Sequence, residues 1–165
     1  GWKNFKFLNR YSIGIEIQNS GHDNKYENFT SKQIYSTKKL LSYLLKKYRV
    51  NFKNVLGHSD IAPDRKKDPG EKFPWKELAR SKLSKWHNLD EKKLRKKRLK
   101  PLNFIEDSKL MRNLSKIGYL KFSKKNYNLN KKILIKAFQR HYRQELINGI
   151  SDQECLLISK NLLKS

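Results

Sequence analysis

The sequence is poor in cysteine, in acidic residues and in long apolar runs. Its single cysteine, Cys155, excludes an internal disulfide and any cysteine-rich zinc module. No window approaches the roughly 20 consecutive apolar residues that a membrane-spanning helix needs. Apolar periodicity nevertheless persists in several segments, so the low hydrophobic content of 36% indicates a folded chain with a solvated surface.

Acidic side chains number 15 against 39 basic ones, which gives the 165 residues a net charge of +24. Such a charge favours anionic partners, among them nucleic acid, acidic lipids and cell-wall polymers. The excess is spread along the chain, because residues 1–79, 80–100 and 101–165 each carry a net charge of +8. Neither an aromatic RNA-binding signature nor zinc-finger spacing is present. We therefore expect no specific nucleic-acid partner.

The first half of the chain reads as strands and helices in alternation. Residues 11–19 alternate three isoleucines with glycine and polar residues, which is the period of a half-buried strand. Residues 50–56 predict a short second strand that leads into His58. Between them, Thr30 and Gln33 fit a capping box that opens a helix.

The second half has a different pattern. Residues 80–100 hold a charge run that ends at Pro101, and we interpret it as an interdomain linker. Apolar stripes at helical spacing follow at Leu110–Ile117, Leu134–Tyr142 and Cys155–Leu162. These stripes predict a compact bundle of three helices.

The stretch from Gly57 to Gly70 carries the clearest candidates for chemistry. It reads Gly-His-Ser-Asp-Ile-Ala-Pro-Asp-Arg-Lys-Lys-Asp-Pro-Gly. His58 and Asp68 lie ten positions apart on this proline-bearing loop. Imidazole nitrogen and carboxylate oxygen are the ligands of a catalytic zinc that keeps one position open for water. The stretch therefore indicates a metal-dependent hydrolase, although two protein ligands are one fewer than the usual three.

Two further residues suit the hydrolysis of an amide. Glu16, on the first predicted strand, fits the group that accepts the water's proton and passes it to the leaving nitrogen. Lys66, two residues before Asp68, fits the cation that stabilises a developing oxyanion. Each has a structural alternative when taken singly: a strand glutamate is commonly a surface group or a salt-bridge partner, and a lysine flanked by Arg65 and Lys67 is commonly just solvated. Asp60 and Asp64 fit turn caps.

The loop at residues 57–70 resembles the C-terminal zinc-binding loop of the AmpD/AmiD group of N-acetylmuramoyl-L-alanine amidases. The segment Ser12-Ile13-Gly14-Ile15-Glu16 resembles that family's central strand, and Phe73-Pro74-Trp75 resembles its short helix after the loop. The resemblance covers residues 1 to about 80.

This resemblance implies a role for each candidate residue. His58 and Asp68 become zinc ligands, Glu16 the catalytic acid/base and Lys66 the group that stabilises the transition state. The implied reaction cleaves the amide between the lactyl group of N-acetylmuramic acid and L-alanine. The implied cofactor is Zn²⁺, and the implied substrates are peptidoglycan or muropeptides.

Residues 102–165 resemble the small helical peptidoglycan-binding domain that is often attached to such amidases. The resemblance is carried by Ile117-Gly118-Tyr119, by Ala137-Phe138-Gln139-Arg140-His141-Tyr142 and by Gly149-Ile150-Ser151-Asp152. We therefore expect an amidase domain at 1–80, a basic linker at 81–101 and a peptidoglycan-binding-like domain at 102–165. The expected fold is α/β, a mixed sheet with flanking helices, followed by an all-α three-helix bundle.

The family's first zinc ligand is a histidine on an upstream strand, which has no counterpart after Gly1. The other histidines, His22, His87 and His141, lie in a loop, near the linker and in the bundle. We therefore expect an N-terminally incomplete amidase domain with weakened zinc affinity. A non-catalytic peptidoglycan-binding remnant and a basic nucleic-acid-binding protein are the alternatives. The expected location is the cell envelope or periplasm, with the cytoplasm as the alternative.

Overall fold

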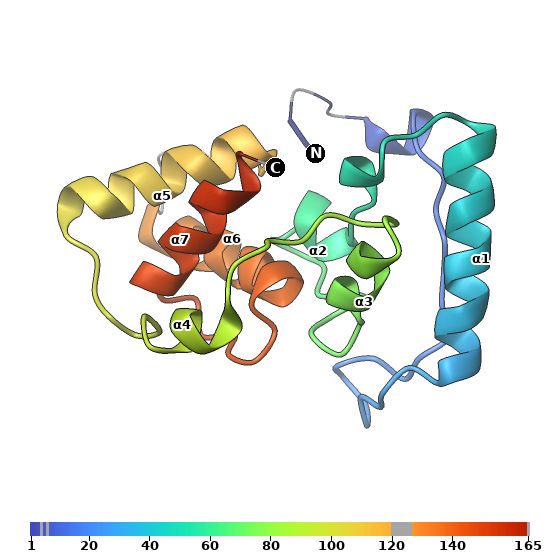
Figure 1. Ribbon diagram of the computed structural model, residues 1–165, viewed down its shortest axis with the longest axis horizontal. Helices are drawn as coiled ribbons and strands as arrows, with labels where there is room; N and C mark the ends of the chain where they lie inside the picture. Colours follow the sequence, from blue (N-terminus) through green and yellow to red (C-terminus); the bar gives the residue numbers. More distant parts are fainter. Residues whose placement is uncertain (4, 6, 120–126, 165) are drawn as a thin grey trace.

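The computed structural model describes residues 1–3, 5, 7–119 and 127–164. Its longest helices are α1 (Ser31–Lys47), α5 (Phe104–Ile117), α6 (Tyr127–Tyr142) and α7 (Gln153–Leu162). The short helices are η1 (Leu8–Arg10), η2 (Phe52–Asn54), α2 (His58–Ile61), α3 (Trp75–Arg80) and α4 (Glu91–Arg95). In Figure 1, α1 lies at one end of the molecule and α5, α6 and α7 lie at the other, with α2 and α3 between them. None of the described helices is long and apolar enough to cross a membrane.

The predicted α/β fold of the first half is wrong, because the described part of the chain holds helices and no strand. Its β-type pairing is limited to isolated bridges from Trp2 to Phe5 and to Tyr119. Residues 11–19 run as an irregular segment beside α1, and residues 52–54 of the second predicted strand form η2 (Figure 1). A strand needs a neighbouring backbone to pair its N–H and C=O groups. Within the described ranges no such neighbour is aligned with residues 11–19.

The alternation at residues 11–19 still decides which side chains face inward. Ile15 and Ile17 are partly buried and pack against an apolar cluster, whereas Glu16 and Gln18 are exposed. Gln33 of α1 donates from Nε2 to the Gln18 carbonyl at 2.7 Å. The period of two therefore predicted the facing of Ile15 and Ile17 correctly, but it was wrong for Ile13, which is 52% exposed, and it did not predict backbone pairing.

The helix termini follow the sequence closely. Thr30 Oγ1 accepts from Gln33 N–H at 3.2 Å and Gln33 Oε1 accepts from Thr30 N–H at 2.8 Å, which confirms the predicted capping box of α1. The three predicted helical stripes correspond to α5, α6 and α7. Asp152 caps α7 by accepting from the Cys155 N–H at 2.9 Å, one residue later than the predicted cap.

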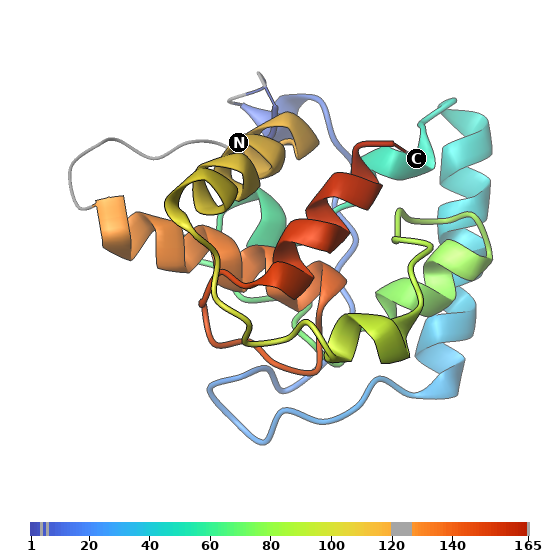
Figure 2. The ribbon, with the colours of Figure 1, turned by 60° about the vertical axis from the view of Figure 1, so that its left-hand side comes forward.

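Two apolar clusters hold the described chain together. The first lies between α1 and α3 and is formed by Ile34, Leu41, Phe73, Trp75, Leu78 and Leu83; we call it the α1–α3 cluster. The second fills the space between α5, α6 and α7, where α5 and α7 cross in contact (Figure 2). It includes Cys155, and burial raises the pKa of that thiol to about 12, as expected for an inert core cysteine.

The basic segment before Pro101 is docked onto the helical second half. Leu94 of α4 is buried in the second cluster. Arg98 donates from Nε to Glu154 at 2.6 Å and from Nη1 to Glu145 at 2.9 Å. These contacts attach residues 91–98 to the bundle, while the domain boundaries at 80 and 101 stay a prediction.

His87 is buried in this docked segment, and its Nδ1 has no partner among the described residues. Burial lowers its pKa below the ordinary value. As the pH falls through about 6.5, His87 therefore becomes protonated in the unfolded chain but stays neutral in the folded chain. We expect the free energy of unfolding to fall as the pH drops from 7.5 to 5.5, and to fall less in a His87→Gln variant. Urea unfolding at several pH values measures this difference, and equal pH slopes in the two proteins would contradict it.

Candidate functional site

The loop between α2 and α3 folds back on itself and brings its two candidate ligands together. His58 is the first residue of α2, and the Asp60 carboxylate fixes the start of that helix by accepting from Gly57 N–H at 2.8 Å. Ser59 N–H donates to the Asp68 carbonyl at 2.9 Å and thereby joins the two arms of the loop. His58 Nδ1 then lies 2.6 Å from Asp68 Oδ2, with side chains 48% and 55% exposed. The predicted nitrogen and oxygen donors thus meet at one accessible point.

Glycine is required at both ends of this loop. A Cβ on Gly57 would lie 2.7 Å from Pro69 Cδ, well inside van der Waals contact. Gly70 has φ +82°, and a Cβ there would overlap the Tyr26 hydroxyl and the His22 ring. A side chain at either position would displace the segment that carries Asp68.

Tyr26 supports the end of the loop. Its hydroxyl donates to the Pro69 carbonyl at 2.7 Å and accepts from Lys72 N–H at 3.1 Å. Burial raises the pKa of Tyr26 to about 12, so the phenol keeps the proton that it donates. His22 stacks on Tyr26 at 4.3 Å between ring centroids, and its Nε2 lies 3.0 Å from Glu71 Oε2. His22 is therefore a neighbour of the loop that interacts with Tyr26 and Glu71.

Two residues of the second half of the chain support the start of the loop. The buried Asp60 carboxylate accepts from the Tyr119 hydroxyl at 2.6 Å and lies 2.7 Å from His141 Nδ1. His141 is itself stacked between Trp75 and Tyr142, at 3.9 and 4.0 Å between centroids. Burial, and next the Asp60 charge, raise the pKa of Tyr119 well above its ordinary value, so the phenol stays a donor.

Sequence reasoning did not find these contacts. Asp60 fits a turn cap, and His141 lies in an apolar helical stripe that indicates core. The single cue was a histidine at a core position, because a buried imidazole needs a polar partner. Its partner lies 81 residues away, so no local pattern identifies it.

The other two predicted site residues are exposed. Glu16 lies on the segment whose isoleucines pack against the α1–α3 cluster. Lys66 lies in the loop, where its N–H donates to the Ala62 carbonyl at 2.9 Å. Within the described residues, no hydrogen bond or ion pair joins Glu16 or Lys66 to His58 or Asp68. The structure therefore brings His58 and Asp68 into contact, and it leaves the roles of Glu16 and Lys66 a prediction.

The donor set suits zinc in kind but is short in number. Imidazole nitrogen and carboxylate oxygen are both zinc ligands, and His58 and Asp68 already face one another. No cluster of three or more His, Cys, Asp or Glu side chains that could hold a metal ion occurs in the described part of the chain. The pair can fill two of the four positions of a tetrahedral zinc.

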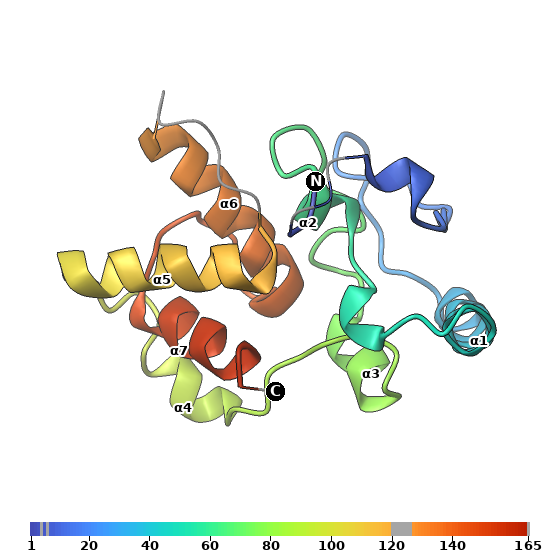
Figure 3. The same cartoon turned by 90° about the horizontal axis from the view of Figure 1, so that it is seen from above.

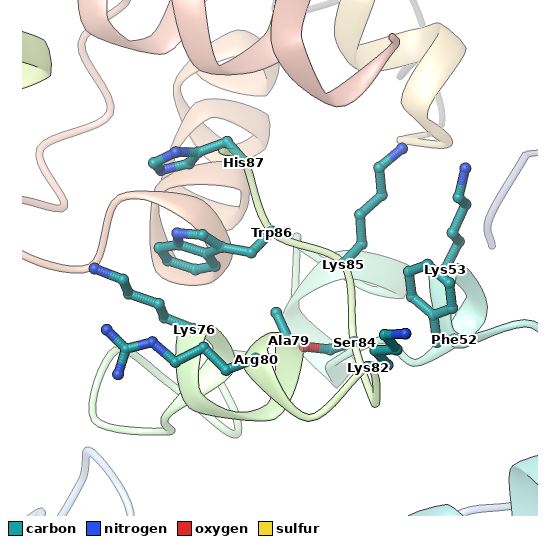
Figure 4. Close-up of a pocket in the computed structure, with 10 residues that line it drawn as sticks. All are labelled: Phe52, Lys53, Lys76, Ala79, Arg80, Lys82, Ser84, Lys85, Trp86 and His87. Carbon is teal, nitrogen blue, oxygen red and sulfur yellow. The ribbon is translucent and has the colours of Figure 1, made fainter. Parts of the chain in front are cut away.

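A separate hollow of about 380 Å³ lies among η2, α3 and the segment after α3 (Figure 4). It is lined by Phe52, Lys53, Lys76, Ala79, Arg80, Lys82, Ser84, Lys85, Trp86 and His87. None of the predicted site residues lines it. The basic residues at its rim reflect the high positive charge of the whole chain and do not indicate a particular ligand, so we assign it none.

Comparison with known proteins gives consistent matches. Residues 1–71 match the family model for N-acetylmuramoyl-L-alanine amidase. The N-acetylmuramoyl-L-alanine amidase AmiD of Escherichia coli is 30% identical over 168 residues, which covers 99% of this chain and 60% of AmiD. The 1,6-anhydro-N-acetylmuramyl-L-alanine amidase AmpD of Haemophilus influenzae is 37% identical over 68 residues, 41% of this chain and 35% of AmpD. The chain thus spans about 60% of the length of AmiD.

Solved structures agree with the sequence matches. The E. coli AmiD structure, a complex with anhydro-N-acetylmuramic acid-L-Ala-D-γ-Glu-L-Lys, matches with a TM-score of 0.85 and 31% identity, over 99% of this chain and 65% of that one. AmpDh3 of Pseudomonas aeruginosa, in complex with anhydromuramic pentapeptide, matches with a TM-score of 0.82 and 33% identity, over 99% and 66%. The similarity therefore extends over both halves of the chain.

Proposed function

We propose that this chain is a member of the N-acetylmuramoyl-L-alanine amidase family and acts as a zinc-dependent amidase on peptidoglycan-derived substrates, as its similarity to these amidases supports. The scissile bond is the amide between the lactyl group of N-acetylmuramic acid and L-alanine. The observation that carries the proposal is the contact of His58 Nδ1 with Asp68 Oδ2 at 2.6 Å on an exposed loop.

Each of the four predicted residues has a distinct task in this proposal. His58 and Asp68 would hold the zinc ion, which when bound supplies Lewis-acid polarisation of the scissile carbonyl. Glu16 accepts a proton from the attacking water and delivers it to the departing nitrogen of L-alanine. The Lys66 ammonium group stabilises the negative charge that develops on the carbonyl oxygen.

The similar structures support a muropeptide substrate. The AmiD structure was determined with an anhydro-N-acetylmuramic acid peptide, and the AmpDh3 structure with anhydromuramic pentapeptide. By that similarity we propose muropeptides as the substrate class of this chain. We further propose that residues 102–165 bind peptidoglycan and that the protein works in the cell envelope.

Zinc binding tests the ligand assignment directly. Replacing either ligand (His58→Ala or Asp68→Asn) is expected to lower zinc affinity at least about 100-fold, because each removes one of two donors. Asp90→Asn is the matched control, since asparagine can still accept the Lys93 N–H that Asp90 accepts at the start of α4. Titration of the purified chain against a competing zinc indicator measures these affinities. Equal affinities in the wild type and both ligand variants would contradict the assignment.

A peptidoglycan-binding role without catalysis is the second candidate. It is favoured by the two-donor site, since within the described residues no third ligand joins His58 and Asp68. Wild-type zinc content well below one equivalent would support this candidate over the enzyme. In both cases the chain is expected to sediment with insoluble peptidoglycan, while any DNA binding falls steeply as salt rises. DNA binding without wall binding would contradict both candidates.

A further inference from the structure

The loop that carries His58 and Asp68 rests against the second half of the chain. Asp60, two residues after His58 on α2, is 1% exposed and accepts from three donors. One donor is Gly57 N–H within the loop. The others are the Tyr119 hydroxyl and His141 Nδ1, which follow α5 and lie within α6. Figure 3 shows α6 beside α2, with α1 distant from both.

The far end of the loop is held from the same side. Gln144, two residues after α6, donates from Nε2 to the Glu71 and Phe73 carbonyls, each at 2.7 Å. Trp75, the first residue of α3, stacks on His141. The segment from α2 to α3 is therefore anchored to the bundle both before and after Asp68.

These anchors matter because α2 cannot hold its own position. A four-residue helix makes too few backbone hydrogen bonds to be stable alone, so its orientation depends on tertiary contacts. Hydrogen bonds to a carboxylate are strong, and those to Asp60 are shielded from water. Because α2 is a single turn, fixing Asp60 also fixes the backbone of His58. A metal site requires its ligands to be held within a fraction of an ångström.

We propose that Tyr119, His141 and Gln144 are positioning residues that set the geometry of the metal ligands His58 and Asp68. Residues 102–165, the helical half, then have two roles. They bind peptidoglycan, as proposed above, and they order the loop at residues 57–70 that carries His58 and Asp68, which we call the metal loop. The inference rests on the proposed zinc site. The three residues bond to Asp60 and the loop backbone, and within the described ranges no hydrogen bond or ion pair joins them to either ligand side chain.

Two variants of the full chain separate this role from simple stability. Both variants keep an aromatic ring against its neighbours: Tyr119→Phe removes only the hydroxyl that donates to Asp60, and His141→Phe replaces the donating imidazole with a slightly larger phenyl ring. Ser159→Ala is the matched control, because it removes a buried hydrogen bond, from Asn113 Nδ2 to Ser159 Oγ at 2.9 Å, that joins α5 to α7. The first measurement is amide hydrogen exchange at Ser59, whose N–H bonds to the Asp68 carbonyl, in metal-free protein. The second is zinc affinity.

We expect a double variant that combines Tyr119→Phe with His141→Phe to lose at least about tenfold protection at Ser59 and about 10- to 100-fold in zinc affinity, while Ser159→Ala changes neither. Zinc affinity equal to wild type in a variant that has lost Ser59 protection would overturn the proposal, as would unchanged protection. A wild type that binds no zinc would overturn the proposed function first and this inference with it, which is a separate outcome. If His141→Phe does not fold, Tyr119→Phe, which removes one oxygen atom, decides alone.

Discussion

A Glu16→Gln variant is expected to lose about 10²- to 10⁴-fold in turnover of a muropeptide amide, the range that general acid–base catalysis contributes. Glutamine has nearly the same shape but cannot accept a proton at neutral pH. Zinc affinity is expected to stay within about twofold of wild type, because no hydrogen bond or ion pair joins Glu16 to His58 or Asp68 among the described residues. The measurement is chromatographic release of the peptide from anhydro-N-acetylmuramyl tripeptide by zinc-loaded protein.

The packing of its segment supports this role for Glu16. The neighbouring Ile15 and Ile17 pack against the α1–α3 cluster, which contains Phe73 and Trp75 from the end of the metal loop. The Glu16 segment and the loop therefore share one apolar support, although no hydrogen bond links them. Because its neighbours Ile15 and Ile17 are packed, the exposed Glu16 carboxylate keeps a fixed direction although its segment has no neighbouring strand in the described chain.

The matched control is Glu77→Gln on α3. Glu77 is a half-exposed glutamate whose carboxylate pairs with Lys38 at 3.3 Å. This variant is expected to keep wild-type turnover, because a surface pair contributes little. Turnover of Glu16→Gln within tenfold of wild type would remove Glu16 from the proposed mechanism.

Replacement of Arg143 by methionine is expected to destabilise the helical half by about 3 kcal/mol, the low end for a broken buried ion pair. Arg143 Nη1 lies 2.6 Å from Asp152 Oδ2 and 3.4 Å from Glu154 Oε2, and all three side chains are buried. The loss stays at the low end because Asp152 keeps the N–H groups of Leu99 and Cys155. Glu154 likewise keeps Arg98. The measurement is the urea midpoint.

Arg95→Met supplies the matched control for this variant. Arg95 pairs with Glu145 at the exposed rim of the same network. Water screens that pair, so its removal is expected to leave the urea midpoint nearly unchanged. Equal midpoints for Arg143→Met and Arg95→Met would show that burial does not determine the strength of this network.

Local features of the chain were predictable because their causes lie within a few residues. The box at Thr30 and Gln33 opens α1, and the stripes of the second half form α5 to α7. The cap of α7 was misplaced by one residue, because Ser151 and Asp152 are both good capping types and the neighbours decide between them. The caps require only hydrogen bonds between near neighbours in sequence, and each apolar stripe is recognised from residues three or four positions apart.

The predicted sheet was wrong because its cause does not lie within a few residues. Alternating isoleucines at residues 11–19 indicate which face is apolar, and Ile15 and Ile17 do face the core, whereas Ile13 is exposed. A strand also needs a second backbone beside it, and in the described chain none pairs with this segment. Periodicity contains no information about whether that partner is present.

The sequence by itself determined the donors of the proposed zinc site, because a loop of ten residues can return His58 to Asp68. It also determined the helical second half and the basic surface. Only the tertiary structure decided that Asp60 is buried between Tyr119 and His141, and that Gln144 holds the far end of the loop. These contacts join residues 59 to 81 positions apart, and a polar side chain does not specify its distant partner until packing removes water from both.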